Sequence, residues 1–193
     1  MGLDIHITVD NQEEVYDAVY FDEQADNFHQ HQLSRTFCNL MCRRDVVNGE
    51  PELDQIGKIT GIDVSPIYDM NDYGDEDSIT WLLDSADTAA ERAERLKTIQ
   101  ANRDKLKGNI DKITLLIADL LNKLSGIHHL SEQLILDAED HDALNNAVYF
   151  ANFNANPGDG YINNNFGQDL RNFKKFLLYA KNKGTQTVYF NYG

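Results

Sequence analysis

The sequence predicts an α+β fold, with a small, mostly antiparallel sheet, packed helices, and one long heptad-patterned helix or helical hairpin inserted between two halves. Three observations predict it. Strand-like alternation lies near both ends of the 193-residue chain, helical periodicity lies between them, and the longest apolar period lies in the middle. We therefore expect residues 1–83 and 128–193 to form an α+β head and residues 84–127 to form the insertion.

The N-terminal half is expected to begin with a β-hairpin and to continue with helices. Residues 3–9 alternate apolar and polar side chains, which is typical of a half-buried strand, and residues 15–21 are rich in strand-forming side chains. A helix is expected over 26–44, where large apolar residues follow one stripe. Repeated Gly and Pro interrupt the pattern over 46–68, so only a short helix near 52–58 is expected there.

Residues 84–125 carry the strongest pattern in the chain. Side chains at alternating spacings of three and four form the a/d seam of a coiled coil, at Leu96, Ile99, Arg103, Leu106, Ile110, Ile113, Ile117, Leu120 and Leu124. About 40 helical residues extend roughly 60 Å, farther than a head of this size reaches. We therefore expect a continuous helix whose seam forms a homo-oligomer, and the alternative is a turn at Gly108 with Asn109 capping a second helix.

The C-terminal half is expected to complete the sheet. Residues 146–153 and 185–192 are rich in aromatic and β-branched side chains and predict two strands. Between them, an amphipathic helix is expected over 166–183, with Gly184 at its end. Residues 130–144 fit either a helix or a strand, and both alternatives stay open.

Composition narrows the function classes. Seventeen Lys and Arg against 32 Asp and Glu give a formal net charge of −15, which repels nucleic-acid phosphates and anionic membranes and attracts a basic protein. No apolar run approaches the ~20 residues of a membrane-spanning helix, and the first residues lack a signal-peptide pattern. Cys38 and Cys42 form one pair, whereas a structural zinc needs about four ligands, so we expect no cofactor. So few cysteines suit the reducing cytoplasm.

Two groups of residues are candidate binding surfaces. The acidic run is expected to meet the basic partner through Asp69, Asp72, Asp75, Glu76 and Asp77. The Asn-rich loop before the helix at Phe166 offers amide side chains and free helical N–H groups to a small ligand. Its candidate ligand-binding residues are Asn154, Asn156, Asn163, Asn164, Asn165 and Arg171.

No motif in the chain specifies a reaction. Asp4 and His6 share a strand face, and such a pair can perform acid–base chemistry, but the sequence places no nucleophile beside them. The acidic cluster at 137–142 is the other hydrolase candidate. We therefore expect a non-enzymatic interaction protein, with a ligand-binding or ligand-sequestering protein and a small hydrolase as alternatives.

The opening Met1-Gly2-Leu3-Asp4-Ile5 and the aromatic segment from Val188 to Tyr192 resemble small uncharacterised proteins of bacteriophages and prophages that begin Met-Gly-Leu-Asp. The resemblance covers the N-terminal strand and the last few residues. It implies an accessory protein without assigned activity. Such a protein would work in the host cytoplasm by binding and inhibiting a host protein, for example a defence protein.

Overall fold

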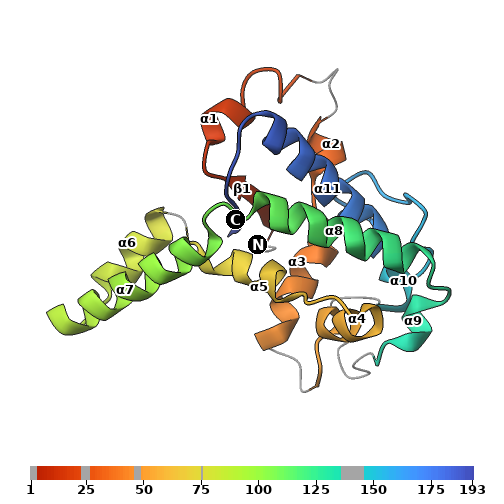
Figure 1. Ribbon diagram of the computed structural model, residues 1–193, viewed down its shortest axis with the longest axis horizontal. Coiled ribbons are helices and arrows are strands. Elements are labelled where there is room, and N and C mark those ends of the chain that lie inside the picture. The colour runs from red at the N-terminus through yellow and green to blue at the C-terminus, as the bar shows by residue number, and fades with distance from the viewer. Residues whose placement is uncertain (1–3, 23–26, 46–48, 75, 136–145) are drawn as a thin grey trace.

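A computed structural model describes residues 4–22, 27–45, 49–74, 76–135 and 146–193. Helices surround a small sheet in a rounded head, and a helical hairpin projects from one side of the head (Figure 1). The two ends of the chain meet at the sheet. The predicted α+β class is confirmed, although the sheet has only two strands in the described part of the chain.

The sheet pairs β1, Ile5–Val9, with β2, Val188–Tyr192, in antiparallel register. Reciprocal backbone hydrogen bonds of 3.0 and 3.1 Å between Asp4 and Gly193 extend the pairing. The predicted alternation of β1 is observed, because its three apolar residues lie in the core while His6 is exposed on the opposite face. The first and last segments of the chain therefore close the fold together.

The strands predicted over 15–21 and 146–153 are not formed, so both predictions are wrong. The short helix α1, Gln12–Val15, is followed by turns through residue 21, and α10 covers Asn146–Tyr149. Aromatic side chains of both segments pack into the core. Burial against helices, rather than strand pairing, accounts for their composition.

The helix predicted over 26–44 is divided by a non-helical segment at 32–34. Ser34 causes the division, because its Oγ caps the next helix by accepting a hydrogen bond from the Phe37 N–H at 3.2 Å. The helical segments of this half are α2 Asn27–His31, α3 Arg35–Cys42, η1 Arg43–Asp45, α4 Glu52–Thr60, α5 Ser65–Asp69 and η2 Met70–Asp72. The short helix expected near 52–58 is confirmed as α4.

The continuous helix predicted over 84–125 is wrong, and the alternative turn at Gly108 is present. α7 covers Ala89–Leu106 and α8 covers Ile110–Ser125. Gly108 has a φ of 73°, a left-handed conformation that glycine adopts without steric cost. The chain therefore contains two separate helices where the heptad pattern predicts one.

A buried side chain fixes this turn. Asn109 Nδ2 donates to the Val188 carbonyl at 2.8 Å, and Asn109 Oδ1 accepts from the Val188 N–H at 2.8 Å. The Gly108 N–H also donates to Thr187 Oγ1 at 3.1 Å. The amide of Asn109 thus closes the outer edge of β2 instead of capping α8.

The predicted oligomer seam is split between two environments. α8 packs against α11, Phe166–Asn182, inside the head. The buried seam residues are Leu106, Ile110, Ile113, Ile117, Leu120 and Leu124. The prediction that they face a second copy is wrong, because their apolar surface is covered within one chain.

The remaining seam residues lie on the projecting hairpin. α6, Glu76–Asp84, and α7 lie side by side in this hairpin (Figure 1). Leu96 is 47 % exposed, while Ile99 and Arg103 are partly buried.

The C-terminal half contributes α9, Leu130–Gln133, and α11, which confirms the helix predicted over 166–183. No helix in the described residues combines the length and apolarity that crossing a membrane requires.

Candidate functional site

The outward side of the two-stranded sheet is the candidate site. His6, Thr8, Tyr189 and Asn191 share this side because alternate residues of paired strands point to opposite faces. A cavity of about 440 Å³ borders it on one side and a groove of about 760 Å³ on the other. Gln12 and Asn191 line both hollows. The two hollows are therefore parts of one surface, which we call the outer face.

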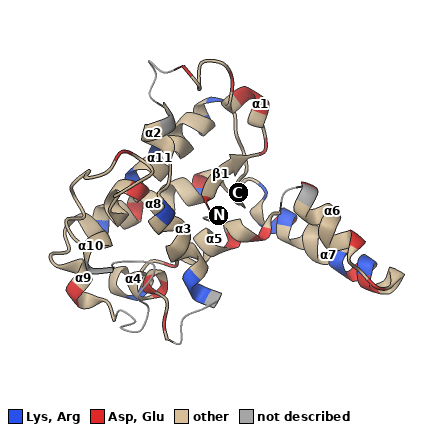
Figure 2. Ribbon diagram, turned by 180° about the vertical axis from the view of Figure 1, so that it is seen from behind, with Lys and Arg blue, Asp and Glu red and all other residues tan. Residues whose placement is uncertain are grey.

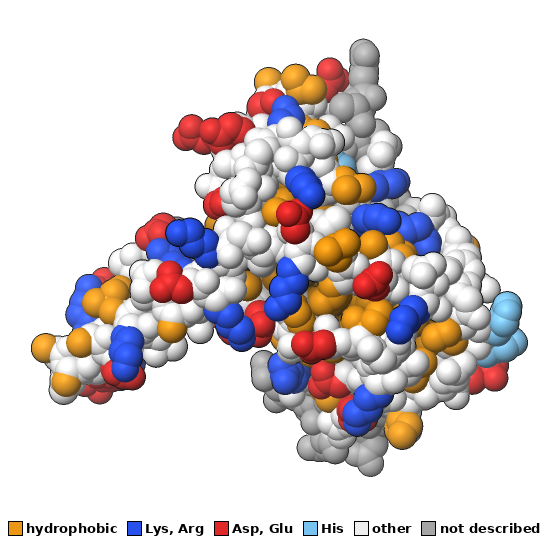
Figure 3. All heavy atoms as spheres, viewed as in Figure 1, with side chains coloured by type: hydrophobic (Ala, Val, Ile, Leu, Met, Phe, Trp, Pro, Cys, Tyr) orange, Lys and Arg blue, Asp and Glu red, His pale blue; other side chains and the backbone are white. Residues whose placement is uncertain are grey.

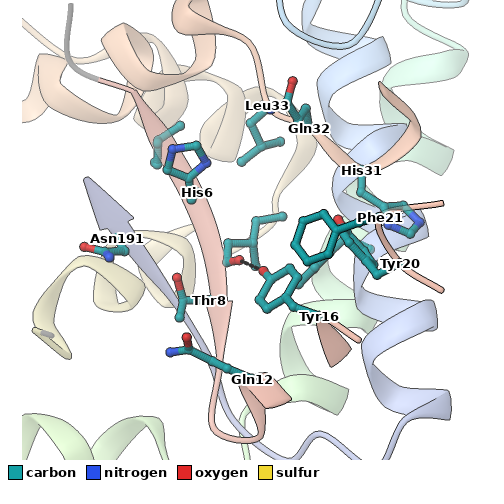
Figure 4. Close-up of a pocket in the computed structure, with 13 residues that line it drawn as sticks. His6, Thr8, Gln12, Tyr16, Tyr20, Phe21, His31, Gln32, Leu33 and Asn191 are labelled. Atoms are coloured by element: carbon teal, nitrogen blue, oxygen red, sulfur yellow. Dashed lines mark hydrogen bonds between the residues drawn. The ribbon is translucent and has the colours of Figure 1, made fainter. Parts of the chain in front are cut away.

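The first hollow, the aromatic cavity, lies beside β1 (Figure 4). Its aromatic walls are Tyr16, Tyr20, Phe21, His31 and Phe176. The rings of Tyr16 and Tyr20 meet edge to face, with centroids 5.0 Å apart and an angle of 88°. Phe21 is 66 % exposed at the rim. The cavity thus has a fixed aromatic wall and one accessible ring at its entrance.

Two polar side chains at this cavity carry buried atoms that lack a hydrogen-bond partner among the described residues, His31 Nδ1 and Gln32 Oε1. Burial lowers the pKa of His31 to about 4, and the nearby charge of Lys175 adds to the effect. The imidazole is therefore neutral at pH 7 and has one donor and one acceptor nitrogen. Apolar walls with a few polar groups are typical of binding pockets.

The edge of β1 that faces away from β2 borders the aromatic cavity, where Ile5 and Ile7 are only 3 % and 5 % exposed. Asp4 and Asp10 form backbone hydrogen bonds toward β2, so the register turns the backbone N–H and C=O groups of Ile5 and Ile7 away from β2. The Tyr16 hydroxyl donates to the Ile7 carbonyl at 2.7 Å (Figure 4). Within the described part of the chain, the Ile5 N–H and C=O and the Ile7 N–H have no hydrogen-bond partner.

The second hollow, the acidic groove, lies between α1 and the base of the α6–α7 hairpin. Its charged lining consists of Asp10, Glu13, Glu14, Glu76 and Arg103, a formal charge of −4 + 1 = −3. Glu13 and Glu14 are exposed and form no ion pair within the described residues. Acidic residues mark α1 in Figure 2, and acidic side chains project from the same region in Figure 3.

An aromatic stack forms the floor of the acidic groove. The rings of Tyr73 and Tyr189 are nearly parallel, with centroids 4.0 Å apart and an angle of 15°. The Arg103 guanidinium lies 5.0 Å from the Tyr73 centroid and donates to Glu76 at 2.9 Å. Arg103, predicted as part of the coiled-coil seam, instead joins α7 to this floor.

The acidic run predicted as the partner surface is partly neutralised by α7. Lys105 pairs with Asp69 at 2.6 Å, and Arg103 pairs with Glu76 at 2.9 Å. Burial raises the pKa of Asp72, and the nearby Asp69 charge contributes to the increase. Two predicted residues, Asp75 and the side chain of Asp77, lie outside the described residues. Among the described residues of this run, only Glu76 lines the acidic groove.

Sequence reasoning missed the carboxylates of α1. A signal for them is present, because eight acidic residues and no Lys or Arg precede Arg35. The run at 69–77 is denser in acidic residues, but density does not show which charges have partners. The unpaired carboxylates lie on α1, where basic side chains are absent from the local sequence.

The predicted ligand-binding loop is held by hydrogen bonds within the chain. Asn165 Oδ1 caps α11 by accepting from the Gln168 N–H at 2.7 Å, and the buried Asn164 donates to Asp169 at 2.7 Å. Arg171 donates a hydrogen bond to Asn156 at 2.9 Å, and Asn154 donates one to the Ser125 carbonyl at 3.2 Å. Asn163 is exposed and has a φ of 63°. Most of the polar groups expected to bind a ligand therefore form hydrogen bonds within the chain instead.

Asp169 is the centre of a buried network that joins α11 to α3 and α10. It accepts hydrogen bonds from the Ser34 N–H and Oγ at 3.0 and 2.6 Å, from Tyr149 at 2.8 Å, and from Asn164 at 2.7 Å. Burial raises the pKa of Asp169 to about 6, although these hydrogen bonds oppose the increase. The network positions the non-helical segment at 32–34, which borders the aromatic cavity.

Of the residues predicted for a hydrolase, Asp4 forms an ion pair with Arg35 at 3.0 Å. Desolvation acts to raise the pKa of Asp4, but hydrogen bonds from Tyr161 and Arg35 exceed it and leave the pKa lowered. The acidic cluster at 137–142 lies outside the described residues. No group of three or more His, Cys, Asp or Glu in the described ranges is placed to hold a metal ion.

Comparison with family models, curated proteins and solved structures finds no match to this chain. The resemblance to phage proteins therefore stays a prediction. The outer face, with its aromatic cavity and acidic groove, carries the candidate site.

Proposed function

We propose that the protein is a non-enzymatic binding module that takes a basic protein partner on its outer face, in the host cytoplasm if the phage resemblance holds. The observation that carries the proposal is the acidic groove, with its formal charge of −3 and the unpaired Glu13 and Glu14. A groove that carries net negative charge attracts a positively charged partner and raises the rate of association. The phage resemblance favours the same class.

The groove suits a segment that carries Arg or Lys. The Glu13 and Glu14 carboxylates can accept charge-assisted hydrogen bonds from such side chains. The stacked rings of Tyr73 and Tyr189 add an aromatic surface over which the stem or the cation can pack. Charge and aromatic surface together favour a basic protein segment over a simple cation.

The double variant Glu13→Gln/Glu14→Gln should weaken binding of basic proteins by about tenfold or more, because two unpaired charges at the groove are removed. The measurement is quantitative capture from a host lysate on the immobilised full chain, at low and at physiological salt. Capture by the unaltered protein should fall as salt rises, since screening weakens charge attraction.

The matched control is Asp119→Asn/Glu132→Gln, which removes two exposed carboxylates elsewhere in the head. Both double variants change the net charge equally, so a general charge effect would alter both. Equal recovery of basic proteins by the unaltered chain and by Glu13→Gln/Glu14→Gln would show that the acidic groove does not bind the partner.

A further inference from the structure

We infer that two copies of this chain associate through their α6–α7 hairpins, with Trp81 of each copy inserted into a hollow between α6 and α7 of the other. The inference goes beyond the proposed function, because it concerns a second surface and a second partner. That partner is another copy of the same chain, and the contact does not involve Glu13 or Glu14.

Trp81 lies on the projecting hairpin and is 72 % exposed. Its neighbour Leu82 is 37 % exposed, and α6 and α7 extend away from the head as a pair (Figure 1). Figure 3 shows hydrophobic side chains along this hairpin and at its far end, among charged ones. Tryptophan is enriched among the residues that anchor protein interfaces, because its large ring buries much apolar surface. Trp81 is therefore an anchor that its own chain leaves in solvent.

A hollow of about 420 Å³ lies between α6 and α7. Ile79, Leu82 and Ile99 supply apolar surface to it. Its volume is within the range of about 300–1,000 Å³ that is usual for ligand pockets, so a large aromatic side chain fits. Asn102 lines the hollow, and its side-chain oxygen can accept a hydrogen bond from an indole N–H, which needs a partner when it is buried. The hairpin therefore carries both an exposed ring and a hollow that suits such a ring.

An anchor and a matching hollow on one element suit a contact between two copies. In a two-fold symmetric contact the same patch is used by both copies, so each Trp81 can fill the hollow of the other. Each ring that is buried removes about 150–250 Å² from water. Two rings and the helix surface around them form a small interface, which is typical of weak association. We therefore expect a dimer whose population depends on concentration.

The charge distribution favours a second copy as the occupant. Residues 76–107 contain six Lys and Arg and seven Asp and Glu, a formal charge of 6 − 7 = −1, so −14 of the total of −15 lies outside the hairpin. Two copies therefore repel each other least where their hairpins meet. Within the hairpin, α6 carries −3 and α7 carries +2. Contact between α6 of one copy and α7 of the other is thus electrostatically complementary.

Sedimentation velocity of the full chain from about 1 µM to about 500 µM tests the inference. The expected result is a change from monomer toward dimer as concentration rises. Trp81 is the single tryptophan of the chain, so its fluorescence should shift to shorter wavelength over the same range as the ring leaves water. Higher salt should strengthen self-association, because it screens the repulsion between two chains of −15. Capture of basic proteins should respond to salt in the opposite direction.

Trp81→Ala should weaken self-association by about tenfold or more, since it removes the anchor. Thr98→Arg places a longer side chain in the hollow and should weaken self-association as well. Its matched control is Gln100→Arg, which makes the same change of charge at an exposed position of α7 outside the hollow. Leu96→Ala removes an apolar side chain that is 47 % exposed on α7 and does not line the hollow. Both controls should leave self-association unchanged.

A monomer at every concentration, with constant Trp81 fluorescence, would overturn the inference. A dimer that persists in Trp81→Ala or in Thr98→Arg would also overturn it, and dissociation by Leu96→Ala alone would place the contact on the heptad seam instead. Circular dichroism confirms that each variant is folded. Trp81→Ala should capture basic proteins as well as the unaltered chain does, so this inference and the proposed function can fail independently.

Discussion

Replacing Asp169 with alanine should lower the free energy of unfolding by about 3–5 kcal/mol, as expected when a buried polar network is broken. Its carboxylate accepts four hydrogen bonds from Ser34, Tyr149 and Asn164. Alanine would leave these donors buried without an acceptor. Urea denaturation at pH 7 measures the loss.

Asp169→Asn is the matched control for this variant. The asparagine oxygen keeps the hydrogen bonds from the Ser34 N–H and Asn164, and its NH₂ group can donate to the hydroxyl oxygens of Ser34 and Tyr149. We therefore expect a change within about 1 kcal/mol at pH 7. A loss as large as that of Asp169→Ala would contradict the hydrogen-bonding account of the network.

Comparison of the unaltered protein with Asp169→Asn isolates the pH dependence of Asp169. Burial raises its folded pKa to about 6, above the ordinary value of 3.8, so the folded chain binds the proton more tightly than the unfolded chain. The contribution of Asp169 to stability should therefore rise as pH falls from above 6 toward 4, by about 3 kcal/mol. Because Asp169→Asn lacks this titration, unfolding free energies of the two proteins should diverge over that range. A difference independent of pH would contradict the raised pKa.

Arg43→Ala should cost about 3–5 kcal/mol of stability, because it leaves the Glu52 carboxylate buried without its counter-charge. The two side chains are only 3 % and 2 % exposed, and they form bonds of 3.1 and 2.9 Å through two nitrogens of the guanidinium. The pair joins η1 to α4. Chemical denaturation at neutral pH measures the loss.

Lys58→Ala is the control, since it breaks the exposed pair between Lys58 and Glu50, whose side chains are 71 % and 39 % exposed. Exposed pairs contribute about 0–1 kcal/mol, so the change should be small. The apolar double variant Arg43→Met/Glu52→Leu should recover most of the stability lost in Arg43→Ala. Equal losses in Arg43→Ala and Lys58→Ala would contradict the importance of burial.

The sequence predicts those elements whose side-chain period matches one buried face. β1 and α11 have such periods and are found where expected. The turn at Gly108 is different, because glycine costs only about 1 kcal/mol within a helix and the heptad continues through it. What fixes the turn is the contact between Asn109 and Val188, which are 79 residues apart. Local periodicity contains no information about such a contact.

Of the candidate site, only the negative charge could be predicted from the sequence. A net charge of −15 favours a basic partner, but the placement of unpaired carboxylates depends on which cations of α7 reach Asp69 and Glu76. The outer face itself depends on pairing between the two ends of the chain. The apolar stripe of α8 needed a partner, as predicted, and the fold supplies one from α11 of the same chain.

The most direct test of the central claim is amide hydrogen exchange, read residue by residue by NMR, with and without a saturating amount of a basic protein recovered on the immobilised chain. We expect slower exchange at the α1 amides, which border the acidic groove. Slower exchange confined to the α6–α7 hairpin around Trp81, which is 72 % exposed, would place the partner elsewhere and contradict the account.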